Sequence, residues 1–186
     1  MATASRLLNY EEWLALPENG EGREECVNGV IEKMPPAKFS PAWIIKRLTR
    51  QLESQLDETK FFVADSDFGL VIRQHPVTQR TPDIAVFVLA NMVQLDGYIH
   101  SAPELAIEVL SPSNSPGRVR ELLADYASIG LPEVWMIDPA ARRITIHILE
   151  NATANPGYRA QEPGPNGVTQ PLRFPSVTVD FSLIWP

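Results

Sequence analysis

The sequence is poor in cysteine and in long apolar runs, and it has no lysine beyond residue 60. Cys26 is the single cysteine, so the chain can form neither an internal disulfide nor a cysteine cluster for zinc. No apolar stretch approaches the roughly 18 residues of a membrane span. The segment Met1–Asn9 lacks a basic stretch followed by an apolar core, so it does not predict a secretory signal. We therefore expect a protein of the reducing cytoplasm with no membrane partner.

The charge balance is acidic, and the cations change in kind along the chain. Together, 16 lysines and arginines stand against 23 aspartates and glutamates, giving a formal net charge of −7. This excess argues against a protein that coats nucleic acid without specificity, but it leaves room for a local basic face that meets DNA. The lysines are Lys33, Lys38, Lys46 and Lys60, and every later cation is an arginine.

Length and patterning favour one domain over residues 1–186, because a chain of this size is rather short for two. Apolar residues at helical spacing predict two long helices, Pro41–Glu58, capped by Ser40, and Arg118–Ile129, ended by Gly130. Two shorter elements are expected before them. They are a helix over Tyr10–Ala15, capped by Asn9, and a hairpin over Arg23–Met34, turning at Asn28-Gly29.

Short segments rich in β-branched or aromatic residues predict the strands. They are Phe61–Ala64, Gly69–Arg73, Asp83–Val88, Glu104–Leu110, Val134–Ile137 and Arg143–Leu149. The last of these could pair with Gly157–Ala160 or with Val177–Val179. The strand–helix–strand unit Glu104–Ile137 favours a parallel pair joined by a crossover. The expected fold class is therefore α+β or α/β, with a mixed β-sheet flanked by helices and an N-terminal β-hairpin.

Two carboxylates, Asp83 and Glu108, carry the strongest chemical signal in the chain. Asp83 opens the apolar run Ile84–Phe87, and Glu108 lies within the run Leu105–Leu110. Burying such a charge is costly unless it is paired or holds a cation. Two of them at one edge of a sheet would repel each other, and a divalent ion relieves that repulsion. The pair therefore predicts a Mg²⁺ site, since this ion is held by one or two carboxylates plus waters and phosphate.

Structural explanations exist for the same residues. Asp83 could simply accept hydrogen bonds from loop amides, and Glu108 could be an inward charge that protects an edge strand. Trp43 and Trp135, at periodic apolar positions, are expected in the core. The histidines do not predict a zinc site, because they lie far apart, at His75, His100 and His147.

Several stretches, in order along the chain, carry a family resemblance. They are Glu25–Glu32 with Met34-Pro35, Pro82–Phe87, Ile107–Ser113, Tyr126, and Gly130–Pro139. Together they resemble a bacterial family of restriction endonuclease-like proteins within the PD-(D/E)xK nuclease superfamily. The helix–strands–helix–strand order expected above agrees with the core of that superfamily.

The resemblance implies a metal-dependent endonuclease. Asp83 and Glu108 would bind Mg²⁺ or Mn²⁺, which would orient an attacking water and stabilise charge on the scissile phosphate. Glu25 would supply an additional carboxylate, or it is a surface charge of the hairpin. Arg118 or Arg120 would contact the phosphate. The implied partner is duplex DNA, and cutting both strands requires two sites, which favours a symmetric homodimer.

The chain departs from the family pattern where lysine is expected. The superfamily has a lysine two residues after the glutamate, where this chain has Leu110. The closer family has one four residues before the tyrosine, where this chain has Leu122. A histidine usual at the start of the long helix is replaced by Ser40–Trp43, and Asn28 stands where aspartate is usual. The alternative is therefore a catalytically inactive nuclease-fold protein that binds nucleic acid or acts in assembly.

Overall fold

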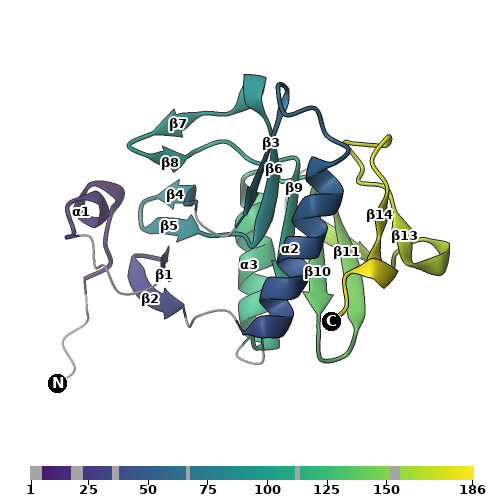
Figure 1. Cartoon of the computed structure of the whole chain (residues 1–186). Helices are drawn as coiled ribbons and strands as arrows, with labels where there is room; N and C mark the ends of the chain where they lie inside the picture. The colour runs from purple at the N-terminus through teal and green to yellow at the C-terminus, as the bar shows by residue number, and fades with distance from the viewer. Residues whose placement is uncertain (1–5, 18–22, 35–37, 66–67, 112–113, 151–155) are drawn as a thin grey trace.

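The computed structural model describes residues 6–17, 23–34, 38–65, 68–111, 114–150 and 156–186. Two six-stranded sheets dominate this part of the chain (Figure 1). Sheet A has the spatial order β2 (Val30–Met34), β1 (Arg23–Val27), β5 (Val77–Arg80), β4 (Leu70–Gln74), β8 (Tyr98–Ile99) and β7 (Gln94–Leu95). Sheet B has the order β12 (Gly157–Gln161), β11 (Arg143–Glu150), β10 (Glu133–Asp138), β9 (Leu105–Val109), β6 (Ile84–Val88) and β3 (Phe61–Asp65).

Within the described ranges, three α-helices lie around these sheets: α1 (Tyr10–Leu14), α2 (Phe39–Glu53) and α3 (Pro116–Ser128). A small sheet joins β13 (Val168–Thr169) to β14 (Val179–Asp180), and short 3₁₀ turns cover η1 (Leu89–Asn91), η2 (Pro165–Gly167) and η3 (Phe181–Leu183). None of the described helices is long and apolar enough to cross a lipid bilayer.

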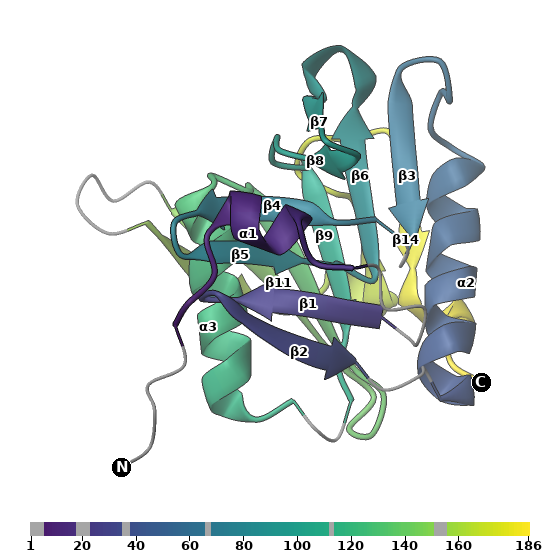
Figure 2. The same cartoon turned by 90° about the vertical axis from the view of Figure 1, so that its left-hand side faces the viewer.

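Sheet B is the central layer, and α2 and α3 lie on opposite sides of it (Figure 2). Strand alternation divides its side chains between two cores. Ile107 and Val109 of β9 belong to the cluster that contains the apolar stripe of α2 and the C-terminal segment. Ala106, which precedes Ile107 and points to the opposite face, belongs to the cluster that contains Tyr126 of α3 and Leu70 of sheet A. The side chains of Ala106 and Glu108 on β9 therefore point toward α3 and sheet A.

The predicted strand–helix–strand unit is confirmed. β9 and β10 are parallel and are joined through α3, whereas the other described pairs of sheet B are antiparallel. α3 begins two residues before the expected Arg118, because the Ser115 hydroxyl accepts from the Arg118 amide and Pro116 occupies the first helical position. Gly130 ends the helix in the left-handed region, at a φ of +75°.

The bounds predicted for the first long helix are wrong at both ends. α2 spans Phe39–Glu53, and its N-cap is Lys38, not Ser40. Pro41 therefore lies in the first turn, where its missing amide costs no helical bond. The helix stops short of Glu58 because the Asp57 carboxylate accepts from the Thr59 amide at 3.0 Å, a local turn that leads into β3. Trp43, expected in the core, is 39% exposed.

The hairpin β1–β2 turns at Asn28-Gly29 as predicted, with both residues at positive φ. β11 pairs with β12, which settles the choice between its two expected partners. Strand β5 was not expected, because its sequence Val-Thr-Gln-Arg shows no apolar alternation. All of its residues are nevertheless buried, and three of them carry polar side chains. One of these, Arg80, bears directly on the candidate site.

Candidate functional site

Asp83 and Glu108 lie side by side on neighbouring strands. In the antiparallel pair β6–β9, Ile84 faces Ile107 and Ala85 faces Ala106, so the next residue outward places Asp83 opposite Glu108. Side chains directly opposite each other share one face of a sheet, with Cβ atoms about 4.5–5.5 Å apart. The Val109 amide also donates to Asp83 Oδ2 at 2.8 Å, which ties Asp83 to β9. The two carboxylates therefore converge on the face that looks toward α3 and sheet A.

The electrostatics of the pair follow from this closeness. Burial raises the pKa of Glu108 well above its usual value, and the negative charge of Asp83 is the next largest cause. Burial also raises the pKa of Asp83, although the hydrogen bond from the Val109 amide opposes that rise. The ionised pair is thus unfavourable in the protein alone, and a bound cation would reverse the balance.

Tyr126 of α3 orients one member of the pair. Its side chain is fully buried, and its hydroxyl donates to Glu108 Oε1 at 2.5 Å. Burial and the neighbouring Glu108 raise the pKa of the Tyr126 phenol well above its usual value, so it remains a donor. The sequence indicates Tyr126 only as part of the family resemblance, and the structure adds it to the site because its hydroxyl bonds to Glu108.

Glu25 lies beside the pair, and both of its carboxylate oxygens already accept hydrogen bonds. Its residue is only 7% exposed, so the alternative of a surface charge on the hairpin is wrong. Its Oε1 accepts from the Thr81 amide at 2.9 Å, and its Oε2 accepts from Arg80 Nη1 at 3.2 Å. Its negative charge is a smaller cause of the raised pKa values of Asp83 and Glu108, after burial.

Arg80 is the central cation of this region, and sequence reasoning missed it. It is 4% exposed, and its Nε and Nη2 donate to Asp125 Oδ2 at 2.9 and 2.6 Å. Its positive charge opposes the rise in the pKa of Glu108. The only signal in the sequence was an arginine three residues before Asp83. Nothing in the sequence paired it with Asp125, which lies on a helix 45 residues further along.

The two arginines expected to contact phosphate lie on the first turns of α3. Arg118 forms an ion pair with Glu32 of β2, and its side chain remains 45% exposed. Glu32 is the cross-strand neighbour of Glu25, so this pair lies at the border of the carboxylate cluster. Arg120 is exposed. The structure thus brings Arg118 near the other candidate residues, whereas Arg120 is placed only on the same helix.

No cation takes either of the positions where the family pattern has lysine. Leu110 and Leu122 are partly buried and pack against the apolar cluster shared by α3, sheet A and sheet B. Asn28 instead bonds within the scaffold, since its amide donates to Glu121 and its oxygen accepts from Arg73. Leu110 and Leu122 therefore contribute to apolar packing, and Asn28 contributes to the hydrogen bonding of the scaffold.

The donor set suits one kind of ion. Across the described ranges, no cluster of three or more histidine, cysteine, aspartate or glutamate residues is arranged to hold a metal. A closed zinc site needs four such ligands, whereas Mg²⁺ and Mn²⁺ accept a carboxylate pair and keep waters or phosphate oxygens as their other ligands. Asp83 and Glu108 therefore fit a hard, partly hydrated cation.

Comparisons with known proteins agree with this arrangement. The family model "Uma2: Putative restriction endonuclease" matches residues 10–182. A crystal structure from Anabaena variabilis, described as "a putative nuclease belonging to DUF820", has the same fold, with a TM-score of 0.72 and 20% sequence identity over 94% of this chain and 96% of that one. No match among curated proteins accompanies them. Because the family model spans nearly the whole chain, the protein belongs to the Uma2 family of restriction endonuclease-like proteins.

Proposed function

We propose that the protein is a metal-dependent endonuclease that hydrolyses phosphodiester bonds in DNA, with Asp83 and Glu108 as ligands of Mg²⁺ or Mn²⁺. The observation that supports this most is their placement opposite each other at the end of the β6–β9 pair, on one face of sheet B. Family membership supports a nuclease-like function in general. The choice of metal rests on the chemistry of the carboxylate pair, and the choice of DNA as substrate rests on the description of the family as restriction endonucleases.

The protein's own groups would hold the two ligands in place. When bound, the ion would lower the pKa of a coordinated water and stabilise negative charge on the scissile phosphate. The Val109 amide fixes Asp83, and the Tyr126 hydroxyl fixes Glu108, so neither carboxylate has to be ordered when substrate arrives. Glu25 would not bind the ion itself. It orients Arg80 and the backbone at Thr81, which lie beside the two ligands.

Arginine replaces lysine as the source of positive charge. An arginine stays protonated, so it can neutralise a phosphate but cannot accept a proton from water. Arg80 is enclosed by Glu25 and Asp125, so its charge offsets theirs rather than reaching a substrate. Arg118, which is more exposed, is the better candidate for a phosphate contact, and Arg120 is the second. Cleavage of both strands of a duplex would require two such sites, as a symmetric homodimer provides.

A second candidate function is a catalytically silent module that binds nucleic acid or acts in assembly. Leu110 and Leu122 favour it, because both pack into the core at positions where the family pattern has lysine. A fold does not guarantee its chemistry. This alternative predicts that the metal site is retained without turnover.

The first prediction concerns metal binding and stability. Saturating Mn²⁺ should raise the melting temperature of the wild type, because an ion at about 100 times its Kd stabilises the folded state by about 2.7 kcal/mol. Asp83→Asn and Glu108→Gln should abolish this rise. Without metal, Glu108→Gln should melt no lower than wild type, because it removes a buried charge beside Asp83. Glu150→Gln, on an exposed surface pair, is the matched control. An unchanged metal response in both site variants would contradict the proposed ligands.

The second prediction concerns cleavage. With Mn²⁺ or Mg²⁺, wild-type protein should convert supercoiled plasmid to nicked or linear DNA, and the activity should disappear in Asp83→Asn and Glu108→Gln. Agarose electrophoresis measures the conversion, and Glu150→Gln should remain active. Metal binding without cleavage of plasmid, single-stranded DNA or RNA would favour the silent module instead.

The third prediction concerns Arg118. Arg118→Ala should weaken DNA binding and reduce the slope of log affinity against log salt by about 1, because one phosphate contact is lost. The stabilisation by Mn²⁺ should persist in this variant. Fluorescence anisotropy with a labelled oligonucleotide at several salt concentrations measures the first effect. Loss of the metal response together with DNA binding would show that Arg118 supports the fold of the site instead.

The fourth prediction concerns Arg80. Arg80→Met leaves two buried carboxylates without their cation and should lower the free energy of unfolding by about 3–5 kcal/mol. Adding Glu25→Gln and Asp125→Asn should restore part of this loss. Arg173→Met, which removes a more exposed partner of Glu104, should cost about 0–1 kcal/mol. Chemical denaturation measures all three. Equal losses for Arg80→Met and Arg173→Met would contradict the role given to the buried network.

A further inference from the structure

α2 concentrates positive charge in an otherwise acidic chain. The stretch from Lys33 to Leu52 holds five lysines and arginines and no aspartate or glutamate, whereas the whole chain has a net charge of −7. Four of these cations lie on α2 or at its N-cap: Lys38, Lys46, Arg47 and Arg50. Among the residues that the structure describes, none of the four forms an ion pair with a carboxylate. Their charge is therefore available to an anionic partner.

Two exposed aromatic rings lie beside these cations. Phe39 is 71% exposed and Trp43 is 39% exposed, and their ring centroids are 5.9 Å apart. The Arg47 guanidinium carbon lies 5.7 Å from the centroid of the Trp43 ring, and its Nε donates to the Leu183 carbonyl oxygen at 3.0 Å. Apolar residues scattered singly over a surface need no partner, but two rings in contact form an exposed apolar patch. Such a patch next to cations indicates an interaction surface.

Helical geometry places these side chains in one stripe along α2. Positions i, i+4, i+7 and i+11 lie on the same side of a helix, and here they are Phe39, Trp43, Lys46 and Arg50. The opposite side consists of buried core residues, which are Ile44, Ile45, Leu48 and Leu52. The stripe, which we call the outer face of α2, therefore points away from sheet B. At a rise of about 1.5 Å per residue, it is about 17 Å long.

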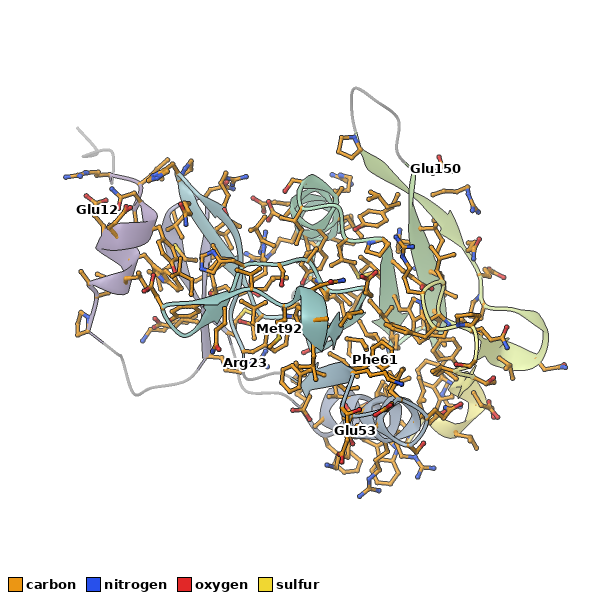
Figure 3. The ribbon with its side chains drawn as sticks, turned by 90° about the horizontal axis from the view of Figure 1, so that it is seen from above. Glu12, Arg23, Glu53, Phe61, Met92 and Glu150 are labelled. Carbon is orange, nitrogen blue, oxygen red and sulfur yellow. The ribbon has the colours of Figure 1, made fainter. Side chains whose placement is uncertain are left out.

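The first turn of α2 lies at the same end of sheet B as the carboxylate pair. Seen from above, Glu53 at the end of α2 lies close to Phe61 at the start of β3 (Figure 3). β3 then runs in the opposite direction to α2, and Figure 2 shows the two elements side by side. The last residue of β3, Asp65, pairs with Ile84, which directly follows Asp83. The outer face of α2 nevertheless points away from α3, so it is distinct from the carboxylate pair.

Two other kinds of partner suit the outer face of α2 less well. Helices that bind a lipid surface insert an apolar face into it, but the apolar side of α2 is buried against sheet B. Two-fold pairing of this face with a second copy of the chain would bring the same cations together, and like charges repel. A partner with a regular array of negative charge fits the face better.

We propose that the outer face of α2 binds the phosphate backbone of duplex DNA. A duplex carries about one negative charge per 1.7 Å of its axis, so a cationic stripe about 17 Å long meets several phosphates whatever the base sequence. The aromatic rings can pack on the apolar thymine methyl groups that the major groove exposes. The inference rests on the proposed nuclease for the choice of DNA as the polyanion, but it requires neither metal nor cleavage. It gives the substrate a second contact, outside the carboxylate pair.

The test is a titration of a labelled DNA duplex with the full-length protein in EDTA, followed by fluorescence anisotropy at several salt concentrations. The double variant Lys46→Gln with Arg50→Gln should weaken binding by about tenfold or more at about 0.1 M salt, and it should lower the slope of log affinity against log salt by about 1.8. Phe39→Gln removes a ring and no charge, so it should weaken binding by about fivefold and leave the slope unchanged. All three side chains are exposed, so the unfolding midpoint in urea should stay at the wild-type value.

Arg159→Gln with Arg173→Gln is the matched control, because it changes the net charge equally at exposed positions outside α2. It should bind the duplex as wild type does. An unchanged slope in the α2 double variant, or an equal loss in the control, would overturn the proposed surface. Retained duplex binding in the α2 double variant, together with lost binding to vesicles of phosphatidylserine and phosphatidylcholine, would overturn it in favour of a membrane.

Plasmid cleavage in Mn²⁺ is scored separately, so that the two proposals can fail independently. Weaker duplex binding by the α2 double variant, without any cleavage by the wild type, would refute the nuclease and retain the DNA-binding surface. Cleavage by the wild type, with equal duplex binding by the wild type and the α2 double variant, would refute the surface alone.

Discussion

The register between β6 and β9 determines the chemistry available to this protein. Pairing Ile84 with Ile107 brings Asp83 opposite Glu108, and a shift of one residue would send one of the two carboxylates to the α2 face. The apolar alternation of both strands holds this register, because their other side chains fill cores on both sides of sheet B. The hydrophobic pattern thus places two like charges opposite each other. A bound cation would reduce the repulsion between them, and the proposed function depends on that cation.

The buried charges around this pair are arranged as a chain of contacts. Arg80 joins Asp125 of α3 to Glu25 of β1, and Tyr126, next to Asp125, joins α3 to Glu108. Each partner comes from a different element, so the hairpin, α3 and sheet B must all be in place before the site exists. Arg80 also supplies buried positive charge to a site in which Leu110 and Leu122 replace lysine. That charge offsets the charges of Glu25 and Asp125, and because arginine stays protonated this residue cannot transfer a proton.

Local patterns predicted much of the fold. The Asn28-Gly29 turn, the crossover through α3 and the burial of Trp135 all follow from short-range sequence signals and are confirmed. The strand predicted over Glu104–Leu110 is also present, one residue shorter at each end. Strand β5 was missed because its buried polar side chains are satisfied by partners distant in sequence. The pairing of Arg80 with Asp125 was missed for the same reason. Trp43 was misplaced because helical periodicity alone does not show where the covering layer ends.

The most direct measurement of the central claim is anomalous diffraction from crystals grown or soaked with Mn²⁺. The account predicts a manganese peak bound by carboxylate oxygens of both Asp83 and Glu108, with Tyr126 still bonded to the glutamate. A peak bound by only one of the two carboxylates, or manganese found only elsewhere on the protein, would contradict it.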